Sequence, residues 1–123
     1  MTSLHQFTGA MGEGTFQTYA ASQGWECWRG VGNTSCDFVI NHPDYIKPRK
    51  VEVKTATPTE RTGRANNHTL AAQFDPKKFD HLFFVTPHGS YWIPVGDLSK
   101  SSIRIACDPD GVALNDKYKG YLV

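Results

Sequence analysis

The chain of 123 residues lacks any long hydrophobic run and carries almost no net charge. Its strongest apolar run, Leu82–Val85, has the length of a β-strand, whereas a membrane helix needs about 20 residues. The first residues have neither a cationic start nor an apolar stretch, so we expect no secretory signal. Thirteen Lys and Arg against twelve Asp and Glu give a formal charge of +1, which excludes a histone-like polycation and an acidic disordered tail.

Cysteine is also scarce. Cys27, Cys36 and Cys107 are an odd number without CxxC spacing, which excludes a disulfide scaffold. The five histidines show no HxxxH or Cys/His metal spacing, so a zinc site is not expected. The length suits a single domain over residues 1–123 with its core at about 9–98. We therefore expect a reduced, intracellular, cytoplasmic protein with no membrane partner.

Hydrophobic periodicity predicts one helix followed by strands, which makes the fold class α+β. The helix is expected over residues 9–23, with Thr8 as its N-cap and Gly24 just after its end. Its core face follows 3.6-residue spacing at Phe16, Tyr19, Ala20 and Gln23. Strands are expected at 25–29, 36–40, 50–56, 79–85, 90–95 and, more weakly, 103–106. Residues 57–67 are interpreted as a mobile loop and the C-terminal end as a polar tail.

The informative pattern joins Asp37 on one predicted strand to Glu52 and Lys54 on the next. Residues two apart in a strand share a face, so Glu52 and Lys54 point together while Val53 takes the other side. If the two strands pair antiparallel, Asp37 lies next to Glu52. Two carboxylates then converge with an ammonium group beside them.

This trio suits phosphodiester hydrolysis. Mg²⁺ prefers oxygen ligands, so Asp37 and Glu52 can bind it together with the backbone carbonyl of Val53. Lys54 can orient the attacking water, stabilise developing charge or act as a base. Glu-x-Lys on a strand is often only a solvated ion pair. However, Asp37 interrupts an apolar strand, where an unpaired carboxylate is costly.

The order of these motifs resembles the PD-(D/E)xK nuclease superfamily, and the nearest kind is the small Holliday-junction resolvases with related homing or restriction-like endonucleases. The resemblance covers roughly residues 9–98 and rests on Gly12-Glu13, Gly24-Trp25, Gly30–Asn33, Cys36–Ile40, Val51–Thr55, Phe79–Val85 and Tyr91–Val95. Cys36 stands where the name-giving proline would be, a position at which many members also lack proline.

The resemblance implies a restriction-endonuclease-like fold, with a central mixed β-sheet flanked by helices. It also implies Mg²⁺-dependent DNA cleavage, with Mn²⁺ as a substitute, that leaves 5′-phosphate ends. Asp37 and Glu52 would match the metal-binding carboxylates, Lys54 the catalytic lysine, and Glu13 the first-helix glutamate that completes the metal shell. From the residues alone, Glu13 is equally well a first-turn carboxylate favoured by the helix dipole.

DNA contact is expected to be electrostatic, because residues 47–64 hold six Lys and Arg against two Glu. The predicted phosphate contacts are Arg61, Arg64 and Lys50, with Arg29 and Asn33 near the Gly-rich turn as further candidates. The three tryptophans, Trp25, Trp28 and Trp92, are expected in the core.

We therefore predict a metal-dependent endodeoxyribonuclease, with junction-resolvase-like selectivity for DNA structure as one option. Two alternatives stay open: a catalytically inactive DNA-binding module of the same fold, and a small interaction protein whose Glu52 and Lys54 pair on a wet face. Cutting a duplex normally takes two active sites, so a homodimer is expected. Its contact surface is predicted at the hairpin around Tyr91-Trp92-Ile93, interpreted as exposed and apolar.

Overall fold

The structure, a computed structural model, describes residues 4–30, 36–61 and 64–123. One long helix comes first, and the regular elements after it are strands and two short 3-10 helices. In chain order the elements are α1 (Leu4–Ser22), β1 (Cys27–Arg29), β2 (Phe38–Ile40), β3 (Arg49–Thr55), β4 (Thr59–Arg61), β5 (Arg64–Gln73), β6 (His81–Thr86), β7 (Gly89–Pro94), η1 (Val95–Asp97), β8 (Ser102–Cys107), β9 (Ala113–Asn115) and η2 (Lys119–Tyr121).

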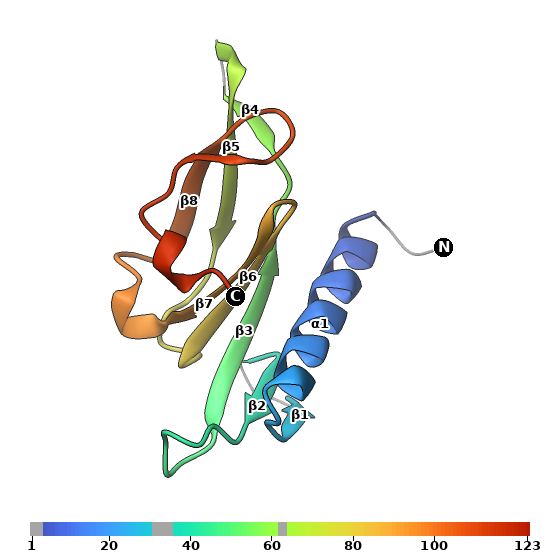
Figure 1. The fold of residues 1–123 in the computed structure, drawn as a ribbon, viewed down its shortest axis with the longest axis vertical. Helices are drawn as coiled ribbons and strands as arrows, with labels where there is room; N and C mark the ends of the chain where they lie inside the picture. Colours follow the sequence, from blue (N-terminus) through green and yellow to red (C-terminus); the bar gives the residue numbers. More distant parts are fainter. Residues whose placement is uncertain (1–3, 31–35, 62–63) are drawn as a thin grey trace.

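The first sheet has the strand order β1-β2-β3-β6-β7. Strands β3 and β6 pair in parallel and all other neighbours pair antiparallel, so the sheet is mixed, as predicted. The expected meander (β1 to β3) and hairpin (β6 and β7) are both present. Helix α1 lies along one face of this sheet (Figure 1). The expectation of flanking helices is wrong in one respect, because the other face packs against a second sheet.

The second sheet, in the order β4-β5-β8-β9, was not foreseen. Residues 57–67, interpreted as a loop, instead contain β4 and the beginning of β5. These two strands pair with each other, and Arg61 of β4 is the register partner of Arg64 of β5. Strand β5 continues to Gln73 and has only one large apolar residue, Leu70. Its sequence therefore carries almost no strand signal, since residues such as Asn and Ala are depleted in strands.

The core between α1 and the first sheet forms around Phe16 and Ala20, which are completely buried. They pack against Phe38, Ile40, Val51 and Phe83. Gln23, expected on this core face, is exposed. The helix also begins at Leu4, so Thr8 lies inside it rather than capping it. Gly24 follows the helix with φ of 76°, as its predicted role requires.

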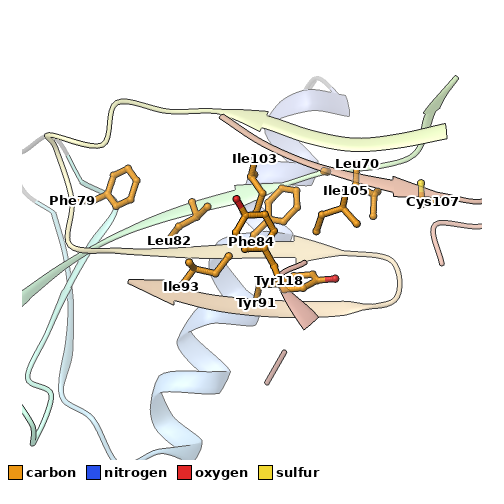
Figure 2. Packing of buried hydrophobic residues seen from close by; sticks show 11 residues of the cluster. Leu70, Phe79, Leu82, Phe84, Tyr91, Ile93, Ile103, Ile105, Cys107 and Tyr118 are labelled. Carbon is orange, nitrogen blue, oxygen red and sulfur yellow. The ribbon is translucent and has the colours of Figure 1, made fainter. Parts of the chain in front are cut away.

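A second core fills the space between the two sheets (Figure 2). Leu82 and Phe84 of β6 and Tyr91 and Ile93 of β7 are fully buried in it. The expectation that the Tyr91-Trp92-Ile93 hairpin presents an exposed apolar surface for a homodimer is therefore wrong. From the second sheet, this core receives Leu70, Ile103, Ile105 and Cys107.

The C-terminal residues are anchored to the β6–β7 hairpin instead of forming a free polar tail. The Tyr91 hydroxyl donates to Asp116 Oδ2 at 2.5 Å, and the backbone N–H of Val123 donates to the Ser90 carbonyl at 3.0 Å. His88 Nε2 lies 2.6 Å from the same Tyr91 hydroxyl. These contacts tie the end of the chain to the inter-sheet core.

Cys27, Cys36 and Cys107 are free thiols. Burial raises the pKa of each, which lowers the fraction of reactive thiolate. Within the described parts of the chain, no helix combines the length and apolar character needed to cross a bilayer.

Gly12 determines how closely α1 approaches β3. A Cβ atom at this position would overlap Thr55 Oγ1 and would lie 3.4 Å from Val53 Cγ1. Two residues further along the helix, a Cβ at Gly14 would meet no atom within 4 Å. The helix can therefore lie directly on β3 only with glycine at residue 12.

Gly12→Ala and Gly14→Ala are thus a matched pair of substitutions with opposite expected effects. Alanine favours a helix over glycine by about 1 kcal/mol, so Gly14→Ala should stabilise the protein by up to that amount. Gly12→Ala should instead destabilise it by about 1–3 kcal/mol, because α1 must move away from β3. Urea unfolding measures both, and equal stabilisation by the two variants would contradict the close approach.

Candidate active site

The candidate site lies where β2 stops pairing with β3, at Asp37. The Asp37 N–H donates to the Val51 carbonyl at 3.0 Å, and the Val53 N–H donates to Asp37 Oδ2 at 2.8 Å. The Asp37 carboxylate thus accepts the hydrogen bond that a backbone carbonyl of a neighbouring strand would otherwise accept from Val53. β2 does not extend far enough to pair with Val53, and we call the resulting space beside Val53 the gap. Because the N–H and C=O of one strand residue point the same way, the Val53 carbonyl also faces the gap.

Glu52 and Lys54 lie on the face of β3 away from α1, because the intervening Val53 and the preceding Val51 face the helix. Asp37 lies just beyond the last paired residues, Phe38 and Val51, and its carboxyl group is close enough to Glu52 to raise the pKa of Glu52. Lys54 Nζ is 3.6 Å from Glu52 Oε1. The structure therefore brings together the three side chains that the sequence pattern singled out.

The two carboxyl groups are half-buried, and the charge on Asp37 makes ionisation of Glu52 more costly. Burial raises the pKa of Asp37, while the hydrogen bond from Val53 and the nearby Lys54 and Arg29 oppose that rise. Burial also raises the pKa of Glu52, the neighbouring Asp37 raises it further, and Lys54 lowers it. Both carboxylates therefore gain from a cation placed between them.

Glu13 of α1 lies near Asp37, but its carboxylate forms an ion pair with Arg29. Its Oε2 accepts a hydrogen bond from Arg29 Nη1 at 2.8 Å, and the Arg29 guanidinium lies over the Phe38 ring at 5.3 Å. Glu13 is close enough to raise the pKa of Asp37. Its role as a metal ligand stays a prediction, since it requires release from Arg29.

The donor set at the gap suits a hard divalent cation such as Mg²⁺. Asp37 and Glu52 offer carboxylate oxygens and Val53 offers a backbone carbonyl, which are the ligand types that such ions prefer. Among the described residues, no group of three or more His, Cys, Asp or Glu side chains is positioned to hold a metal. The protein would therefore supply two carboxylates, and water and substrate oxygens would supply the remaining ligands.

The side of β1–β3 that faces away from α1 also carries other side chains, and we call it the open face. None of the described residues of β1 or β2 belongs to the inter-sheet core, so the second sheet does not bury this part. By strand alternation and register, the open face consists of Trp28, Val39, Lys50, Glu52 and Lys54, and Asp37 lies near Glu52 just outside β2.

The predicted DNA contacts fall in three places. Lys50 is exposed on the open face, and Arg61 and Arg64 are paired at the tip of the β4–β5 hairpin. Arg29 lies on the face of the first sheet that packs against α1, where it forms an ion pair with Glu13. Asn33 lies outside the described residues.

Trp28 is the residue that sequence reasoning misplaced, because its side chain is 47% exposed rather than in the core. Trp25 and Trp92 do pack on the helix side, with ring centroids 5.3 Å apart. His81 stacks on Trp92 at 4.4 Å, and its burial lowers its pKa to about 4. A neutral His81 within an aromatic cluster is consistent with a structural role.

Glu52→Gln tests the electrostatics of the pair, because it removes one charge and keeps the side-chain size. The raised pKa of Asp37 and of Glu52 means that the folded protein binds protons more tightly than the unfolded chain. Metal-free wild type should therefore lose stability as pH rises from about 4 through the raised values. At neutral pH the variant should be more stable in EDTA, on the order of 1 kcal/mol.

Thermal unfolding across the pH range measures this difference, with Asp110→Asn as a remote carboxylate control. Mg²⁺ should stabilise the wild type more than Glu52→Gln. A wild type whose stability does not fall relative to the variant as pH rises would contradict the charge repulsion.

Comparison with known proteins finds similarity in structure, and neither the family models nor the curated proteins give a match in sequence. Among solved structures, the chain is similar to the bacterial homing endonuclease I-Ssp6803I, with a TM-score of 0.62 and 18% identity over 99% of this chain and 88% of that chain. At this low identity the similarity concerns the fold, and the chain therefore shares the fold of a nuclease.

Proposed function

We propose that the chain is a divalent-metal-dependent DNA endonuclease with a PD-(D/E)xK-type active site. The observation that carries the proposal is the convergence of Asp37 and Glu52, from adjoining strands, at the gap beside Val53, with Lys54 at 3.6 Å from Glu52. The shared fold with a homing endonuclease supports DNA as the substrate. Magnesium, with manganese as a substitute, is the proposed cofactor.

Each residue of the site has a distinct role in this proposal. Asp37 and Glu52, with the Val53 carbonyl, would hold the cation, and the hydrogen bond from Val53 fixes the orientation of Asp37. When bound, the cation would neutralise charge on the phosphate and make a water molecule more acidic. The Lys54 ammonium, only partly exposed, can orient the attacking water and stabilise charge that develops on the phosphate oxygens.

The open face would hold the phosphate backbone next to the carboxylates. Lys50 and Lys54 supply positive charge there, and Arg61 and Arg64, at the β4–β5 turn, are proposed as further phosphate contacts. A single such face cuts one strand, so cleavage of both strands of a duplex or resolution of a junction would require two copies of the chain.

Cleavage of labelled DNA tests the proposal directly. The substrates are a linear duplex, a nicked duplex, a flap and a four-way junction, each with Mg²⁺ or Mn²⁺. Wild type should cut at least one of them, and EDTA should stop the reaction. Asp37→Asn, Glu52→Gln and Lys54→Ala should each lower the rate by about a hundredfold or more, since each removes charge stabilisation at the reacting phosphate.

Asp110→Asn and Lys77→Ala, two exposed residues outside the site, provide the matched controls and should cut like the wild type. Equal rates in the wild type and the three site variants would show that the site is misassigned. DNA binding without cleavage of any substrate would favour the inactive DNA-binding module.

The basic hairpin gives a separate prediction about binding. If Arg61 and Arg64 contact phosphates, the affinity of wild type for DNA should fall steeply with salt, and Arg61→Ala together with Arg64→Ala should reduce the log–log slope by roughly 2. Fluorescence anisotropy with a labelled duplex measures the slope, with Lys77→Ala as the control. If the double substitution leaves the slope unchanged, these two arginines do not contact DNA phosphates.

A further inference from the structure

The side chain of Trp28 points toward the open face. In β1, Cys27 packs into the helix-side core and Arg29 binds Glu13 of α1, so the intervening Trp28 must project to the opposite side. Its register partner on β2 is Val39. Trp28 thus shares a face with the carboxylate pair.

Trp28 lies close to the candidate site along this face. The register places Trp28, Val39 and Lys50 in one row across the sheet, and Asp37 comes two residues before Val39 in the chain, near Glu52. Two residues along a strand and one strand across correspond to roughly 8 Å between the Cα atoms of Trp28 and Asp37. An indole at that distance can reach the nucleotide next to a phosphate held by the carboxylates.

An indole that is 47% exposed requires an explanation. Large apolar side chains left on a surface beyond what function needs are unfavourable, and tryptophan is enriched where a surface binds a partner. The other two tryptophans are packed on the helix side. Aromatic side chains beside cationic groups are the arrangement by which proteins bind unstacked nucleotides, and Lys50 is the cation in the row of Trp28.

We propose that Trp28 is a substrate-positioning residue that stacks on a nucleobase adjacent to the scissile phosphate. This inference rests on the proposed nuclease function and adds a contact that selects the DNA substrate. A base face is free at a mismatch, a nick or a junction, and is covered in an intact duplex. Trp28 therefore favours DNA with an unpaired or unstacked base next to the cleavage position.

Tryptophan fluorescence reads out this contact without depending on cleavage. With Ca²⁺ in place of Mg²⁺, the probes are an intact duplex and the same duplex with one unpaired nucleotide. The second probe should quench part of the wild-type fluorescence and shield it from acrylamide. Trp28→Phe should lose this response, because Trp25 and Trp92 are packed away from the open face.

Affinity provides the second measurement. Trp28→Ala should raise Kd for the probe with the unpaired nucleotide roughly five- to 150-fold, the range expected for loss of one base stack. Trp28→Phe should recover most of that loss, since phenylalanine retains an aromatic face. Leu114→Ala, an exposed apolar residue on β9, is the control and should bind like the wild type.

The outcomes separate this inference from the proposed function. If the wild type cuts DNA in an Asp37-dependent manner but Trp28→Ala binds both probes with unchanged Kd, the stacking role is overturned and the nuclease stands. Equal losses on the two probes would also overturn it, since no unstacked base would then be involved. If the wild type neither binds nor cuts DNA, both proposals fail.

Discussion

The hydrogen bond from the Val53 N–H to the Asp37 carboxylate is the contact on which the candidate site depends. It forms where β2 leaves β3, and it holds an acidic side chain at a place in the sheet where a backbone carbonyl would otherwise be required. The same bond aims Asp37 toward Glu52. The fold thereby brings two carboxylates together at a cost in desolvation, and a cation bound between them, as proposed, would offset that cost.

Much of this arrangement follows from strand periodicity. The alternation in Val51-Glu52-Val53-Lys54 separates a core face from a polar face whatever the strand packs against, because successive side chains point to opposite sides. The short connection from β2 to β3 makes antiparallel pairing the natural choice, and that pairing brings Asp37, just before β2, close to Glu52. Local patterns were therefore sufficient for the helix, the meander, the hairpin and the proximity of Asp37, Glu52 and Lys54.

The features that escaped prediction depend on contacts between distant segments. Strand β5 pairs with β4 and, along its C-terminal half, with the distant β8, and these pairings make a strand of a segment rich in Asn and Ala. Trp28 looks like a core residue by its type, but β1 is an edge strand and its outer face has no covering layer among the described residues. The partner of Glu13 was hidden as well, because Arg29 reaches it only once α1 lies on the sheet.

Strand β6 has a consequence for how the molecule loses its structure. Phe83 belongs to the core beneath α1, whereas Leu82 and Phe84 belong to the core between the sheets, so one strand is the common wall of both. Neither α1 nor the second sheet can unfold without exposing apolar residues of β6, the strand that also helps to form the other core. The pairing of β6 with β3 extends this coupling to Glu52 and Lys54. Loss of the geometry of the candidate site and global unfolding should thus be one cooperative event, and partial denaturation would not separate the two.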